Sequence, residues 1–161
     1  MRLIFTLIFC LFSACLVADG PKRELRGVWV ATVQNIDWPS PRNYDGAKQK
    51  TEFIDLLNSH QKTGINALFV QIRTASDALY AKSAEPWTTY LSGKQGQAPS
   101  PYYDPLEFMI DQTHARGMEF HAWLNLNRAS MSSRSLLSSE HVARKHPEWL
   151  LSYNGQLLFD F

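Results

Sequence analysis

The sequence is poor in cysteine, in net charge and in long apolar runs, and each shortage excludes a class of protein. Its 2 cysteines are Cys10 and Cys15, so the remainder of the chain has no thiol nucleophile and no disulfide. Lysine and arginine number 16 against 15 aspartates and glutamates, a balance that offers nucleic acid no electrostatic attraction. The apolar run at residues 3–12 is shorter than the roughly 20 residues of a transmembrane helix.

What the sequence does contain is typical of a globular protein. Its 161 residues are 45% hydrophobic and 12% aromatic, enough for one domain with a buried core. Flat aromatic rings, including 5 tryptophans, hold sugars, bases or peptides when they line a cleft. In the interior the same rings would only pack.

The first residues resemble an export signal. Met1 and Arg2 precede the apolar run, which ends in Leu11-Phe12-Ser13-Ala14-Cys15 and resembles the lipobox of bacterial lipoproteins. We therefore expect residues 1–18 to be a signal peptide, with Cys15 acylated. The protein would then be exported and face the periplasm or the cell surface, touching the membrane only through its lipid. The alternative is cleavage near Ala18 without lipidation.

Strands and helices alternate through the first three quarters of the chain. The hydrophobic patterns predict strands at 24–33, 64–73 and 117–125, and helices at 47–63 and 105–116. Thr51 or Gln49 lies near the expected start of the first helix, and Gly64 and Gly117 follow the two helices. Asp104-Pro105-Leu106-Glu107 is a capping box, so both acids are assigned to capping. This alternation predicts an α/β fold with a parallel sheet.

Polar residues follow each predicted strand, where parallel sheets usually bind ligands. Arg73 ends the second strand and Asn125 the third, and Asp37 and Trp38 follow the first. Asp37 and Trp38 could form a corner of a cleft, or Asp37 could simply cap its loop while Trp38 packs over the rim. The sequence leaves both interpretations open.

A long connection follows Arg73. It carries Asp77, Tyr80, Glu85, Trp87 and Tyr90, and loops of this length in compact domains are usually functional or mobile. Carboxylates beside aromatic rings suit sugars, although the rings could also bury themselves.

Glu119 and His121 share one face of the third strand, but two ligands make a weak metal signal, and a buried, hydrogen-bonded histidine is favoured.

The last part of the chain departs from the alternation. A serine-rich stretch at 130–139 leads to a short predicted helix at 140–145. The strands at 150–153 and 156–159 then flank Asn154-Gly155, a strong β-hairpin signal.

Three groups of motifs together resemble the glycoside-hydrolase-like family 10 proteins. They are the run from Leu25 to Pro39, then Gln71-Ile72-Arg73 with Asp77-Ala78-Leu79-Tyr80 and Glu85-Pro86-Trp87, and finally Tyr103-Asp104-Pro105-Leu106 with His121-Ala122-Trp123-Leu124-Asn125. The resemblance implies an exported (β/α)8 TIM barrel with a carbohydrate cleft, of which residues 24–161 would be the N-terminal portion. Such a barrel needs about 250 residues. The resemblance therefore also implies a chain truncated after the third β/α unit and the hairpin.

The expected function is hydrolysis of a polysaccharide, with the glycan strands of peptidoglycan as a candidate substrate. The expected substrate-binding residues are Asp37, Arg73, Asp77, Trp87, Trp123 and Asn125. Glycosidases use a pair of carboxyl groups. None of Asp37, Asp77, Glu85 and Glu119 stands out as the proton donor. The resemblance implies a fourth strand that ends in a cluster of aspartates, so at least one of the two acids is expected beyond Phe161. No cofactor or metal is expected. The alternatives are a non-catalytic glycan-binding barrel and an inactive fragment.

Overall fold

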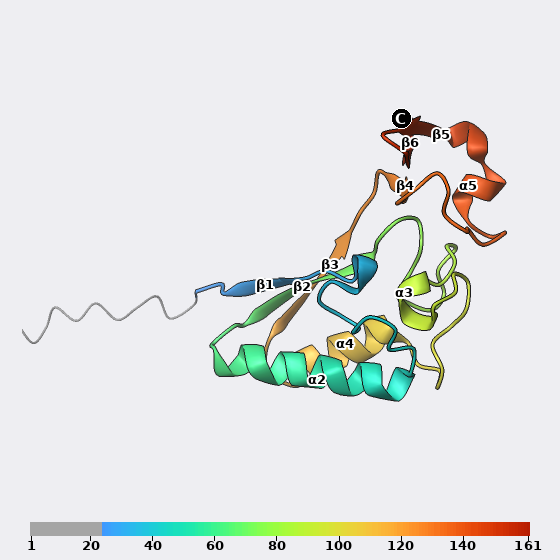
Figure 1. The fold of residues 1–161 in the computed structure, drawn as a ribbon. Coiled ribbons are helices and arrows are strands. Elements are labelled where there is room, and N and C mark those ends of the chain that lie inside the picture. Colours follow the sequence, from blue (N-terminus) through green and yellow to red (C-terminus); the bar gives the residue numbers. More distant parts are fainter. Residues whose placement is uncertain (1–23) are drawn as a thin grey trace, which may run out of the picture.

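A three-stranded parallel sheet with two helices forms the body of the molecule (Figure 1). The structure is a computed structural model, and it describes residues 24–161. The sheet order is β1-β2-β3, from β1 (Gly27–Val30), β2 (Ala67–Arg73) and β3 (Glu119–Leu124). Helix α2 (Gly46–Lys62) connects the first two strands, and α4 (Pro105–His114) lies between β2 and β3. The predicted parallel α/β alternation is confirmed, whereas the signal peptide and Cys15 lie outside the described residues.

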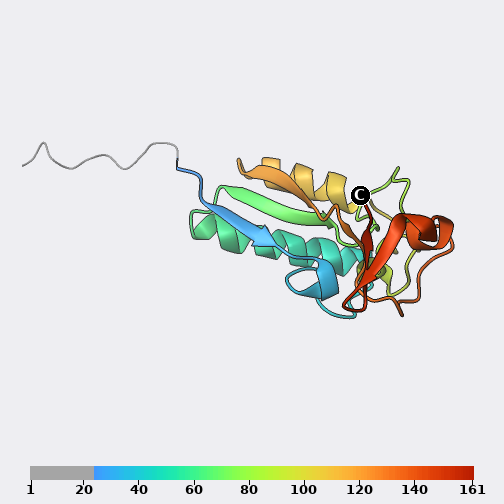
Figure 2. The same cartoon turned by 90° about the horizontal axis from the view of Figure 1, so that it is seen from above.

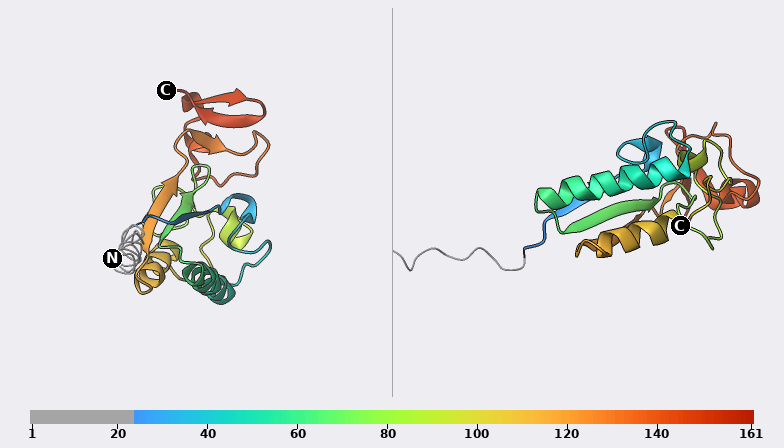
Figure 3. Two further views of the ribbon diagram at one scale, coloured as in Figure 1. Left: turned by 90° about the vertical axis from the view of Figure 1, so that its left-hand side faces the viewer. Right: turned by 90° about the horizontal axis from the view of Figure 1, so that it is seen from below.

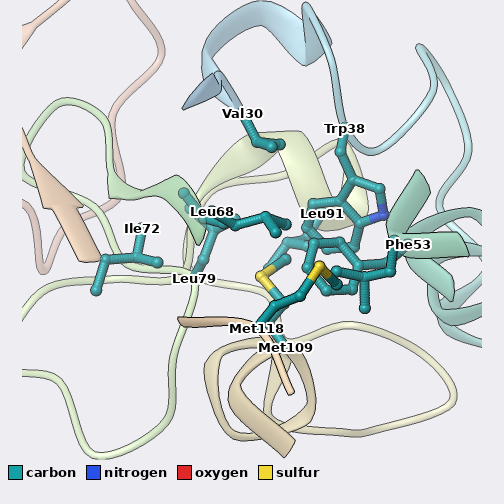
Figure 4. Close-up of a cluster of buried hydrophobic side chains, with 11 residues drawn as sticks. Val30, Trp38, Phe53, Leu68, Ile72, Leu79, Leu91, Met109 and Met118 are labelled. Atoms are coloured by element: carbon teal, nitrogen blue, oxygen red, sulfur yellow. The ribbon is translucent and has the colours of Figure 1, made fainter. Parts of the chain in front are cut away.

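Both long helices cover the same face of the sheet, as the view from above shows (Figure 2). Phe53 and Leu57 of α2 and Met109 of α4 are fully buried against the strands. Figure 4 shows the cluster that they join, which contains Val30, Trp38, Phe53, Leu68, Ile72, Leu79, Leu91, Met109 and Met118 among others. Each fully buried large side chain contributes about 1.5–3 kcal/mol. This core holds the carboxyl ends of the three strands at one edge.

Helix α2 begins earlier than predicted, and a carboxylate explains the difference. The helix begins one residue before the predicted Ala47, and the Asp45 side chain is its N-cap, because it accepts hydrogen bonds from the amides of Ala47 and Lys48. Gln49 is instead fully buried, and its amide donates to the carbonyls of Asn43 and Leu91 at 2.7 and 2.8 Å. A residue expected at a helix terminus thus joins α2 to two loops.

The face of the sheet opposite the helices carries a row of aromatic rings. Trp29, Phe69 and His121 are neighbours across the strands, with stacked centroids 4.9 and 4.5 Å apart. Gly27 makes room for this row, because a Cβ there would lie 2.7 Å from the Phe69 ring. The prediction of a buried His121 is wrong: it bonds to Glu119 at 3.0 Å but is 41% exposed, since no described element covers this face.

The C-terminal part forms a second, antiparallel sheet above the carboxyl edge of the first (Figure 3). Its order is β4-β6-β5, from β4 (Arg128–Ser130), β5 (Leu150–Tyr153) and β6 (Gln156–Phe159). The predicted hairpin is confirmed, and Asn154 and Gly155 both have positive φ. Strand β4 was not predicted, because three residues give too little pattern.

Short helical turns complete the structure. They are η1 (Val33–Asn35), α3 (Thr89–Ser92), α5 (Val142–Lys145) and η2 (Pro147–Trp149). Within residues 24–161 no helix has the length and apolar character needed to span a membrane.

The N-cap of α4 gives a stability prediction. Asp104 accepts bonds from the amides of Leu106 and Glu107, and its second oxygen accepts one from Ala81 at 2.9 Å. We expect Asp104→Ala to lower the free energy of unfolding by about 1–2 kcal/mol in urea titrations. Asp111→Ala is the matched control on the exposed side of the same helix and should change stability by less than about 0.5 kcal/mol. Equal effects of the two substitutions would contradict the capping role.

Candidate functional site

Three of the six residues other than glycine with positive φ in the described part of the chain lie in the loops at the carboxyl edge of the parallel sheet. Gln34 and Asn35, which follow β1, both have φ of 55°, and Ser76, which follows β2, has φ of 51°. Residues other than glycine rarely adopt this left-handed conformation, which costs energy and is concentrated at functional sites. The edge that the sequence indicated as a ligand site thus also carries strained loops.

Arg73, at the end of β2, ties the connection after β2 to the residues that follow β3. Its Nε donates to both carboxylate oxygens of Glu85, at 3.0 and 2.7 Å, and Nη2 donates to Glu85 and to the Ser76 hydroxyl. Its Nη1 donates to the carbonyls of Asn125 and Leu126. A guanidinium has five N–H donors, and all of them have protein partners here. Arg73 therefore positions the loops and has no donor left for a substrate.

Asn125 and Trp123 belong to the same network. The Trp123 Nε1 donates to Asn125 Oδ1 at 2.9 Å, and Asn125 Nδ2 donates to the Thr74 carbonyl at 3.1 Å. The backbone amide of Asn125 donates to the carbonyl of Arg73 at 3.1 Å. The structure thus brings Arg73, Asn125 and Trp123 together at one edge, which the strand pattern had indicated for Arg73 and Asn125.

Asp77 lies beside this network and is almost completely buried. Its Oδ1 accepts bonds from the amides of Thr74 and Ala75 and from the Thr74 hydroxyl. No hydrogen bond to Oδ2 is found within residues 24–161, and Asp77 lines the cleft described below. One oxygen of this carboxylate therefore shapes the loop and the other is available to a ligand.

Asp37 and Trp87 lie elsewhere. The Asp37 carboxylate accepts the Ala31 amide at 2.7 Å and caps the loop after β1, while Trp38 is buried and donates to the Gln49 carbonyl. This geometry fits the loop-capping interpretation of Asp37. Trp87 packs on the core and meets the ring of Tyr102 edge-on, with centroids 6.5 Å apart. Neither Asp37 nor Trp87 lines the cleft.

The other two carboxylates considered from the sequence are also paired. Glu85 is held by Arg73, and Glu119 begins β3 at the opposite end from Arg73, where it bonds to His121. Among residues 24–161 no group of three or more His, Cys, Asp or Glu side chains could hold a metal ion. Glu85 and Glu119 are therefore each engaged by a basic side chain within the described part of the chain.

A cleft of about 860 Å³ opens beside the sheet edge, between α3 and the serine-rich segment. Its floor includes Ala75 and Asp77, and its two walls come from residues 89–95 and from residues 130–144. The side chains that can bind a polar ligand there are Asp77, Tyr90, Lys94, Gln95, Ser130, Ser133, Ser135, Ser138 and Arg144. This size lies within the range of about 300–1,000 Å³ that ligand sites usually have.

Tyr90 also lines the cleft; the sequence named it among the aromatic residues of the long connection but not among the expected substrate-binding residues. Burial raises the pKa of its hydroxyl, the Asp77 charge adds to this, and the Gln34 amide and Arg128 act in the opposite direction. The Tyr90 hydroxyl is therefore a neutral donor between the loops after β1 and β2. The long loop was noted in the sequence, but Tyr90 itself carries no distinguishing motif. Arg128 and the serines lie in segments whose roles only the tertiary structure shows.

The fold is a mixed α/β arrangement with a parallel sheet, and sequence comparison shows the family to which the chain belongs. Residues 24–158 match the family described as Glycosyl hydrolase-like 10, and the chain belongs to this family. It is similar to the glycosyl hydrolase YngK of Bacillus subtilis (strain 168), with 50% identity over 139 residues, covering 85% of this chain and 27% of that protein.

A second relative is more distant. The glycosyl hydrolase DigH of Escherichia coli (strain K12) is 33% identical over 155 residues, which cover 86% of this chain and 35% of that protein. The chain thus spans about a quarter to a third of the length of these curated relatives.

The Arg73 network predicts that lysine cannot replace this arginine. Arg73→Lys keeps the charge but loses the two-pronged contact with Glu85, so we expect the free energy of unfolding to fall by about 2–4 kcal/mol. Arg42→Lys is the control, because Arg42 is exposed and makes no side-chain hydrogen bond within the described part of the chain. Urea unfolding measures both. Similar stabilities of the two variants would show that the network does not hold the loops.

The tyrosines give a prediction at alkaline pH. Burial raises the pKa of Tyr103, whose hydroxyl donates to Gln49, and burial also raises the pKa of Tyr90. In an absorbance titration of the folded protein, we expect these two of the 6 tyrosines to ionise last. Because the unfolded chain releases these protons near pH 10, stability should be fully present below that pH and fall above it. Simultaneous ionisation of all tyrosines in a folded protein would contradict this.

Proposed function

We propose that this chain forms the first three β/α units of a TIM barrel in a glycoside hydrolase that acts on a polysaccharide. The observation that carries the proposal is the cleft at the carboxyl edge of the parallel sheet, in a member of a glycosyl-hydrolase-like family. TIM-barrel enzymes place their sites at this edge. The exposed aromatic face supports the same proposal, since it would line the interior of a closed barrel.

The proposed chemistry is acid–base catalysis by a pair of carboxyl groups roughly 5 to 10 Å apart. The pairing of Glu85 with Arg73 and the capping by Asp37 leave Asp77 as the described carboxylate with an oxygen toward the cleft. We propose that Asp77 binds substrate and that the catalytic acids lie in sequence beyond these 161 residues.

The proposed substrate is the glycan strand of peptidoglycan, and the proposed location is outside the cytoplasm. The lipobox-like residues that end in Cys15 support export with a lipid anchor, which would place the cleft next to the cell wall. Both relatives bear the name glycosyl hydrolase, which supports a glycan in general. The choice of the cell-wall polymer rests on the resemblance and the signal sequence.

A second candidate function is glycan binding without cleavage. It is favoured by one observation: the described carboxylates at the sheet edge are committed to structural bonds, Glu85 with Arg73 and Asp37 with Ala31. The cleft with Tyr90 and the serines would remain a binding surface.

The test is cleavage by the full-length protein of glycan strands stripped of their peptides, compared with intact peptidoglycan. We expect new reducing ends from the stripped strands. Asp77→Asn keeps the Oδ1 acceptor for Thr74 and Ala75 but removes the charge, and it should lower the cleavage rate about tenfold or more. Asp111→Asn, on the exposed side of α4, should have no effect.

The outcomes separate the two candidates. A folded full-length protein that binds the strands and releases no reducing ends would favour the binding function and contradict the hydrolase. A protein that neither binds nor cleaves any polysaccharide would contradict both.

A further inference from the structure

Hydrogen bonds within the protein hold the segments that line the cleft beside the sheet edge in place. His141 is fully buried, its Nδ1 accepts the Ala143 amide at 3.1 Å, and its Nε2 therefore carries a proton and donates to the Ala75 carbonyl at 3.1 Å. At the other end, the Ser138 amide donates to Gln95 Oε1 at 2.8 Å. These bonds fasten the serine-rich wall to the floor and to the opposite wall. A site held open in this way loses little entropy on binding.

The lining of the cleft mixes hydroxyl groups with small apolar surfaces. Ser133 and Ser135 make no side-chain hydrogen bond with any part of the chain that the structure describes. The apolar lining comes from Met131, Leu136, Leu137, Ala143 and Leu157. A sugar ring presents hydroxyls at its rim and C–H groups on its faces, so both kinds of surface have partners on it. A purely apolar ligand would leave the hydroxyls unsatisfied.

Tyr90 provides the directional contact in this cleft. Tyr90 lies in the lining of the cleft, so its hydroxyl is placed to donate to a ligand there. Asp77 and Arg128 are the charged groups beside it. A ligand hydroxyl near Tyr90 would accept a hydrogen bond from the Tyr90 hydroxyl. The same ligand hydroxyl could donate a hydrogen bond to Asp77 Oδ2. This pairing fixes where an acceptor of the ligand must lie.

We propose that the cleft between α3 and residues 130–144 is a saccharide subsite next to the Arg73 network, and that the Tyr90 hydroxyl is its specificity-determining donor. The inference rests on the proposed function and goes beyond it, because it assigns the sugar contacts to Tyr90, Ser133 and Ser135. None of these was among the binding residues expected from the sequence. The subsite holds a neighbouring sugar of the glycan chain while the reacting bond lies over the sheet.

The experiment is calorimetric titration of the full-length protein with a soluble oligomer of β-1,4-linked N-acetylglucosamine. Tyr90→Phe removes only the hydroxyl and should weaken binding about 5- to 10-fold, as expected for one lost hydrogen bond. Ser135→Trp places a large ring into the cleft from an exposed loop and should weaken binding at least about tenfold. The matched controls are Tyr102→Phe and Ser139→Trp, which lie outside the cleft lining and should bind within about twofold of the parent.

The results distinguish this subsite from the broader function. Weakening by Tyr90→Phe and Ser135→Trp, with unchanged controls and an unchanged unfolding midpoint for Ser135→Trp, supports the subsite. Unchanged binding in both cleft variants overturns the subsite and leaves the proposed function standing. The absence of binding to a protein that still cleaves stripped strands also overturns the subsite alone. The absence of both binding and cleavage overturns the two proposals together.

Discussion

The ion pair between Arg73 and Glu85 is the interaction on which the arrangement of the sheet edge depends. It joins the last residue of β2 to the middle of a long connection, and the same guanidinium holds two carbonyls after β3. With side-chain exposures of 11% and 24%, the pair is shielded enough for its bonds to contribute more than those of a surface pair. The connection after β2 and the segment after β3, which lie far apart in the sequence, thus have one common support.

This support explains why polar residues at strand ends can be structural. Arginine, asparagine and tryptophan are residue types that bind sugars, and the pattern of the strands placed them at the correct edge. In the structure they bond mainly to one another, as the Trp123–Asn125–Thr74 chain shows. The surface open to a ligand is the adjoining cleft, which is lined by Asp77, Tyr90 and residues of the serine-rich segment. Residue type and position along a strand cannot separate these two roles.

Much of the fold could be predicted from local patterns. The two long helices, the three parallel strands and the Asn154-Gly155 hairpin follow from periodicity, caps and turn residues, which act over a few positions. The N-cap of α2 could have been found, because Asp45 precedes the helix directly. Strand β4 and the cleft could not, since they depend on bonds between distant residues such as His141 and Ala75. The exposure of His121 likewise depends on which elements cover the sheet.

The long connection between β2 and α4 has two parts with different freedom to change. Up to Leu91 it is tied to the body of the molecule, through the Glu85 ion pair and through the burial of Leu91 itself in the core. Residues 92–98 follow, and none of them is buried, although Lys94 and Gln95 line the cleft. Substitutions at an exposed position of this short stretch such as Lys94 can change one wall of the cleft without disturbing the core. Evolution could therefore diversify ligand preference within this scaffold by varying a single surface segment.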